Sequence, residues 1–195
     1  MSREAAMATA TDYFEAGQFK SDLAELVSYR SESQSSAPEA RAQSYEYLSE
    51  AIQPRLLAIG FACEIIDNPD PEGGPLLLGE RKEDDGLPTI LTYGHGDTVR
   101  GQKGMWRDGL DPWTITEEGD RLYGRGTADN KSQHLINIAA LEAVLKARGS
   151  LGFNTRIVVE MSEEVGSLGL REVFEHHKDR LTADVLIASD GPRLQ

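Results

Sequence analysis

The clearest pattern along the chain is an apolar stripe at helical spacing in its second half. Between residues 130 and 148 one face of the predicted helix is apolar, and Gly149 follows as a stop signal. The stripe consists of Leu135, Ile138, Leu141 and Leu145. This spacing predicts a helix over residues 130–148. Weaker patterns predict a short helix around Leu23, Leu26 and Val27 and another over about residues 168–178.

A second long helix is predicted over residues 38–59. Pro38 suits a first helical turn, and Gly60 suits the position just beyond the last turn. Pro54 lies inside the pattern, so we expect a kink or a break there, because proline cannot donate a backbone hydrogen bond. Residues 1–18 have no continuous apolar stretch. We expect them to form a loose lead-in to one domain over residues 19–195.

Short apolar runs of strand length alternate with these helices. They cover residues 61–66, 76–79, 89–93, 155–161 and 184–188. A turn signal at residues 68–74 separates the first two runs, and residues 100–122 lack periodicity, which predicts a long loop. Strands separated by helices predict an α/β fold with helices packed on both faces of a sheet.

Composition narrows the possible partners. The net charge of -13 comes from 33 acidic and 20 basic residues, and such a surface repels nucleic acid and anionic membranes. We therefore expect neither as a partner. Cys63 is the single cysteine and cannot form an internal disulfide. No signal peptide or membrane span is visible, so we expect a cytoplasmic location.

Ionisable residues gather where predicted strands end or where the clearest helix begins. His95 and Asp97 follow one strand, Asp129 precedes the helix, and Glu163–Glu164 and Asp190 follow two further strands. In open α/β sheets ligands bind at the carboxyl ends of the strands, so these segments are expected to converge. Each segment alone also fits an ordinary role, such as a helix N-cap or a solvated acidic turn.

Taken together, four of these residues form a set of nitrogen and oxygen ligands. The set is His95, Asp129, Glu164 and Asp190, and it suits zinc, with manganese or cobalt also tolerated. Asp97 lies two positions after His95, so both side chains point to the same side of an extended segment. This spacing allows Asp97 to hold the second ring nitrogen of a metal-bound histidine.

The order of these residues resembles the di-zinc peptidase family of aminoacylases, carnosinase-type dipeptidases, acetylornithine deacetylase and succinyl-diaminopimelate desuccinylase. The run Leu122–Lys131 resembles the second motif of that family, and Glu163–Ser167 resembles the third. The resemblance covers roughly residues 20–192. It implies a mixed, mostly parallel sheet sandwiched by helices. This would be the N-terminal portion of the catalytic domain, ending before the lid and dimerisation domain.

The resemblance also implies a role for each ligand. His95 and Asp190 would bind one zinc ion, Glu164 would bind the other, and Asp129 would bridge the two. The implied reaction is hydrolysis of amide or peptide bonds in dipeptides or N-acyl amino acids. Full-length relatives are expected to form homodimers.

Two further residues receive catalytic roles from the same resemblance. Asp97 would orient His95, and Glu163 would be the general base that takes a proton from the attacking water. The family often has a cis peptide after the bridging aspartate, which corresponds to Asp129–Asn130 here.

The chain also departs from the family pattern. Ser132 stands where a glycine usually follows the motif lysine. A second metal-binding histidine and an oxyanion-stabilising histidine have no match, and we expect His134, His176 and His177 to be helix-surface or packing residues. Two alternatives therefore stay open: a truncated, non-catalytic metal-binding fragment or regulatory module of the same fold, and a different di-zinc aminopeptidase family.

Overall fold

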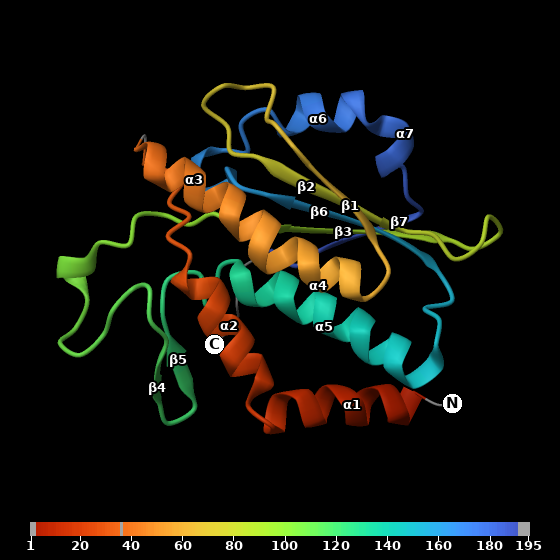
Figure 1. Cartoon of the computed structure of the whole chain (residues 1–195), viewed down its shortest axis with the longest axis horizontal. Helices are drawn as coiled ribbons and strands as arrows, with labels where there is room; N and C mark the ends of the chain where they lie inside the picture. Colours follow the sequence, from red (N-terminus) through yellow and green to blue (C-terminus); the bar gives the residue numbers. More distant parts are fainter. Residues whose placement is uncertain (1–2, 36, 191–195) are drawn as a thin grey trace.

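A five-stranded mixed sheet forms the centre of the protein. The computed structural model describes residues 3–35 and 37–190. The strand order is β1-β2-β6-β3-β7 (Figure 1). β3 pairs in parallel with β6 and β7, whereas β2 is antiparallel to β1 and β6. Every strand except β2 therefore points the same way, which confirms the mixed, mostly parallel sheet. The strands are β1 (Ala62–Ile66), β2 (Leu76–Arg81), β3 (Thr89–His95), β6 (Asn154–Glu160) and β7 (Val185–Ala188).

Helices cover both faces of this sheet. Side chains alternate across a strand, so Ile157 and Val159 of β6 pack on one face while Val158 packs on the other. The first face carries α2 (Gln18–Ser28), the π-helical segment η1 (Tyr47–Ile52), α4 (Gln53–Ala58) and α5 (Lys131–Arg148). The second face carries α6 (Leu170–His176) and α7 (Lys178–Leu181) (Figure 1). This arrangement confirms the sandwich predicted from the sequence.

The predicted interruption at Pro54 takes the form of a π-helical segment. α3 (Pro38–Glu46) continues into η1 and then into α4, where Pro54 occupies the first turn. The N–H of Gln53, just before the proline, donates to the carbonyl of Leu48 five residues earlier. A wider turn of this kind accommodates a proline that would clash with a regular α-helical ladder.

The N-terminal segment corrects one expectation. Residues 1–18 were expected to form a loose lead-in, but α1 (Arg3–Glu15) is a helix that packs against α5. It is rich in alanine, which has the highest helix propensity, and none of its residues is buried. A helix without a buried stripe has no apolar periodicity, which explains why the pattern did not reveal it.

The predicted long loop over residues 100–122 is also more ordered than expected. It contains a short 3-10 turn, η2 (Lys103–Met105), followed by the antiparallel pair β4 (Thr116–Glu118) and β5 (Arg121–Tyr123). Gly119 turns between these strands with a left-handed φ of 62°. None of the described helices is long and apolar enough to cross a membrane.

Candidate metal centre

The predicted site residues meet at the carboxyl ends of three neighbouring parallel strands. His95 is the last residue of β3, and Asp129 lies just before α5. Glu163 and Glu164 open the 3-10 turn η3 (Glu163–Val165) after β6, and Asp190 follows β7. Because β6, β3 and β7 are adjacent and parallel, these ends share one edge of the sheet, as predicted.

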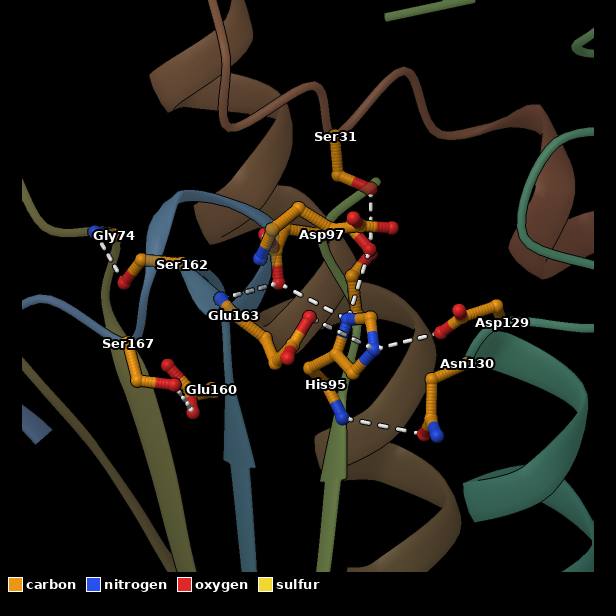
Figure 2. A network of polar contacts seen from close by, with 12 residues as sticks. Ser31, Gly74, His95, Asp97, Asp129, Asn130, Glu160, Ser162, Glu163 and Ser167 are labelled. Carbon is orange, nitrogen blue, oxygen red and sulfur yellow. Dashed lines mark hydrogen bonds and ion pairs between the residues drawn. The ribbon is translucent and has the colours of Figure 1, made fainter. Parts of the chain in front are cut away.

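His95 is the centre of the cluster (Figure 2). Its side chain is completely buried, and its Nε2 atom lies 3.0 Å from Asp129 Oδ1, 3.7 Å from Glu163 Oε2 and 3.9 Å from Asp190 Oδ2. Within the part of the chain that the structure describes, His95, Asp129 and Asp190 are the group whose donor atoms, all within 4.8 Å of one another, have the arrangement of a metal site.

The electrostatics of His95 test whether a cation fits here. Burial lowers its pKa, but the hydrogen bond and charge of Asp97, together with Glu163 and Asp129, raise that pKa to about 9. The surrounding carboxylates therefore stabilise a positive charge near His95 Nε2. A divalent metal ion would be stabilised by the same negative charges, and one imidazole nitrogen with carboxylate oxygens is a donor set that suits zinc.

Asp97 links the histidine to the acidic turn. Its buried carboxylate lies 3.2 Å from His95 Nδ1, which is also 3.1 Å from the Asp97 backbone oxygen. The two carboxylate oxygens accept hydrogen bonds from the backbone N–H groups of Glu163 and Glu164, both at 3.1 Å. A proton on Nδ1 leaves Nε2 free for a metal, which is the geometry expected of an orienting aspartate.

Glu163 and Glu164 occupy different positions relative to the cluster. The Glu163 carboxylate points towards His95 (Figure 2). Burial raises its pKa, which His95 lowers and the nearby carboxylates raise further. Burial and then the negative charge of Asp129 raise the pKa of Glu164, so the carboxylates of the cluster also act on this residue. Glu164 lies outside the group formed by the other ligands, and its metal role stays a prediction.

The sequence did not identify several polar residues that hold this site. The Asn130 amide accepts from the His95 N–H at 3.3 Å and donates to the Ser189 carbonyl at 2.8 Å. The Ser31 hydroxyl donates to the Gly96 carbonyl at 2.6 Å. These residues bind backbone atoms, which no spacing of side chains in the sequence would mark. The Asp129–Asn130 peptide is cis, as the resemblance implies.

Known proteins resemble this chain over most of its length. The sequence model of Peptidase family M20/M25/M40 matches residues 91–195. Beta-Ala-His dipeptidase of Mus musculus is 33% identical over 186 residues, which cover 89% of this chain and 37% of that protein. Cysteinylglycine-S-conjugate dipeptidase of Corynebacterium striatum is 31% identical over 172 residues, covering 87% of this chain and 36% of that protein.

A solved structure supports the same assignment. The crystal structure of human carnosine dipeptidase 1 superposes with a TM-score of 0.84 and 29% sequence identity, covering 95% of this chain and 41% of that chain. This chain therefore spans less than half the length of the relatives that it matches. The family match, the related dipeptidases and the shared fold together show that the chain belongs to Peptidase family M20/M25/M40, a family of metallopeptidases.

Proposed function

We propose that this chain carries the metal-binding and proton-transfer residues of a hydrolase that cleaves amide or peptide bonds in dipeptides or N-acyl amino acids. The observation that carries the proposal is the convergence of three carboxylates on His95 Nε2, at 3.0, 3.7 and 3.9 Å. The substrate class follows from the relatives, which are named as dipeptidases and, in Pasteurella multocida, as acetylornithine deacetylase.

The proposed centre holds two zinc ions, and cobalt or manganese suits the same ligands. His95 and Asp190 would hold one ion, Glu164 would hold the other, and Asp129 would be shared between the two. Asp129 suits the bridging position because it lies 3.0 Å from His95 and its charge also acts on Glu164. Bound ions would supply Lewis-acid chemistry, which polarises a substrate carbonyl and lowers the pKa of a bound water.

The protein groups supply the proton transfer and the orientation. Glu163 takes the proton from the water as the water oxygen attacks the carbonyl carbon, and then delivers it to the nitrogen of the departing amine. The raised pKa of Glu163 brings this carboxyl closer to neutrality, which suits a group that must both accept and release a proton. Asp97 holds His95 in place from the opposite ring nitrogen.

Glu163→Gln tests the assignment, with Glu172→Gln on the exposed surface of α6 as the matched control. We expect Glu163→Gln to retain zinc binding and to lower dipeptide or N-acyl amino acid turnover by at least about 100-fold. Zinc content and turnover are measured in this chain and in a version extended to the length of its relatives.

Each outcome separates two interpretations. Loss of zinc in Glu163→Gln would mean that base and ligand are exchanged. Zinc binding without turnover in both lengths of wild-type protein would support the alternative, a non-catalytic metal-binding or regulatory module. The cytoplasmic location, the lack of nucleic-acid or membrane partners, the domain over residues 19–195 and the homodimer of longer relatives stay predictions from the sequence.

A further inference from the structure

Asn130 connects the ends of two strands that carry proposed metal ligands. Its side chain is completely buried. Its Oδ1 atom accepts a hydrogen bond from the backbone N–H of His95 at the end of β3, at 3.3 Å (Figure 2). Its Nδ2 atom donates to the carbonyl of Ser189, next to Asp190, at 2.8 Å. One amide group therefore joins the β3 end to the β7 end.

The hydrogen bonds of this amide also fix the state of His134 in α5. Because the Ser189 carbonyl only accepts, Nδ2 must face it, and Oδ1 must face His95 and His134. The distance from Asn130 Oδ1 to His134 Nδ1 is 3.3 Å, so this ring nitrogen must carry the proton. His134 Nε2 is then an acceptor, and the hydroxyl of Tyr47 donates to it.

All three side chains lie in the core. Tyr47 and His134 are buried like Asn130, and burial, together with the charges of His95 and Lys131, lowers the pKa of His134 to about 3. His134 is therefore neutral, as a ring with one donor and one acceptor requires. Gly94 permits the close approach, because a Cβ atom there would lie 2.8 Å from His134 Cβ and 3.1 Å from Asn130 Oδ1.

Ser189 receives a second anchor from the same helix. Its hydroxyl lies 3.0 Å from Asn137 Nδ2 and 3.2 Å from Asn137 Oδ1. The residue before Asp190 is therefore held through both its carbonyl and its hydroxyl, although β7 itself is exposed. Asn130 and α5 therefore add side-chain anchors to the pairing of β7 with β3 next to Asp190.

We propose that Tyr47, His134 and Asn130 form a buried positioning chain that sets the separation of His95 and Asp190 and thereby the zinc affinity of the centre. The proposal rests on the metal centre proposed above. None of the three residues touches the ligand atoms that would hold the metal. They act by fixing the backbone on either side of it, through a hydrogen-bond chain in which every donor and acceptor has one possible direction.

Zinc affinity provides the first test, measured by competition with a chelating dye. Asn130→Leu removes both bonds of the amide at similar volume, and we expect its zinc Kd to rise about 10–100-fold, the usual cost of losing a group that supports a metal ligand. Tyr47→Phe removes one hydroxyl and keeps the packing, and we expect a smaller rise of about 3–10-fold. Tyr45→Phe, which loses a surface bond to Asp67, is the control and should bind zinc as wild type does.

The ring nitrogen chemical shifts of His134 provide a second test that needs no metal. Wild-type protein should show a neutral ring with the proton on Nδ1, and Asn130→Leu, which removes the acceptor that faces Nδ1, should lose this preference. A proton on Nε2 of His134 in wild-type protein would overturn the proposed directions of these hydrogen bonds. An unchanged zinc Kd in both Tyr47→Phe and Asn130→Leu would overturn the positioning role of the three residues. If Asn130→Leu does not fold, Tyr47→Phe decides alone. Wild-type protein that binds no zinc would instead overturn the metal centre itself, together with this role.

Discussion

β6 and β7 both deliver acidic residues to the same site, yet they lie in opposite surroundings. β6 is central in the sheet, and Ile157, Val158 and Val159 are at most 1% exposed. β7 is an edge strand, and Val185, Leu186 and Ile187 are 48%, 62% and 44% exposed. Glu163 and Glu164 thus follow a buried central strand, whereas Asp190 follows an exposed edge strand.

This difference shows that different interactions hold the acidic residues after β6 and after β7 in place. Side chains after β6 are placed by the core, because Ile157 and Val159 of that strand pack on one face of the sheet and Val158 packs on the other. Next to Asp190, Ser189 has polar anchors from Asn130, just before α5, and from Asn137 in α5, because the exposed side chains of β7 contribute little packing. We therefore expect substitutions in β6 to act through global stability and changes near β7 to act locally.

The largest expected effect compares the same substitution in the two strands. Ile157→Ala in β6 should lower the free energy of unfolding by about 2–4 kcal/mol, because it leaves a cavity in the core. Ile187→Ala in β7 should cost less than about 1 kcal/mol, because that side chain is already partly in water. Urea unfolding of the metal-free proteins measures both. Equal costs would show that β7 is packed as firmly as β6.

Backbone protection gives the second measurement of the contrast. Hydrogen-bonded amides of β7 should exchange with solvent at least about tenfold faster than those of β6, because an edge strand opens without global unfolding. Zinc should slow the exchange in β7 of wild-type protein, and Asp190→Asn should abolish that slowing if Asp190 binds the metal. Exchange followed by NMR distinguishes the two strands. Equal protection in β6 and β7 would remove the basis for the comparison.

The fold was predictable where burial imposes a period on the sequence. The stripe of α5 and the apolar run of β6 are both in contact with the core, so their spacing records their neighbours. α1 has no buried residue, and β4 and β5 have three residues each, so their positions depend on helix propensity and backbone hydrogen bonds. Such elements leave no apolar period that a sequence reader could detect.

The site was predictable for residues whose own chemistry is unusual at a strand end. His95, Asp129 and Asp190 were found because ionisable groups in these places converge in an α/β sheet. Asn130 and Ser31 were missed because their partners are backbone atoms of residues far away in the sequence. The buried position of Glu160 was not predicted, because this residue lies within the apolar run of β6 and has no spacing that sets it apart.

Glu160 provides a smaller test, on the β6 side of the comparison. Its Oε1 atom accepts hydrogen bonds from Tyr93 and Ser167, and its Oε2 atom has no hydrogen-bond partner among the residues that the structure describes. Burial raises its pKa above the usual value, although those two hydrogen bonds lower it. The folded state therefore holds this proton more tightly than the unfolded state, and stability falls as the pH rises through the folded pKa.

Glu160→Gln removes this loss because its side chain does not ionise. In metal-free protein, we expect the Tm difference between Glu160→Gln and wild type to become more positive from pH 5 to pH 8. Calorimetry at both pH values measures this difference, with Glu172→Gln on the exposed surface of α6 as the matched control. A constant difference for Glu160→Gln would mean that this carboxyl ionises equally in both states.

The smallest expected effect on stability concerns the exposed surface of β7. Leu186→Lys should change the free energy of unfolding by less than about 0.5 kcal/mol, because the side chain is 62% exposed. The same substitution should reduce concentration-dependent self-association, since an apolar edge strand offers unpaired backbone groups to another chain and a lysine opposes that pairing. Sedimentation across a concentration series measures this self-association. Lys82→Leu, on the surface just after β2, tests whether an exposed leucine at another position also promotes self-association. If Leu186→Lys unfolds the protein, β7 is buried in solution and the contrast with β6 fails; if it only lowers association, β7 is an open edge.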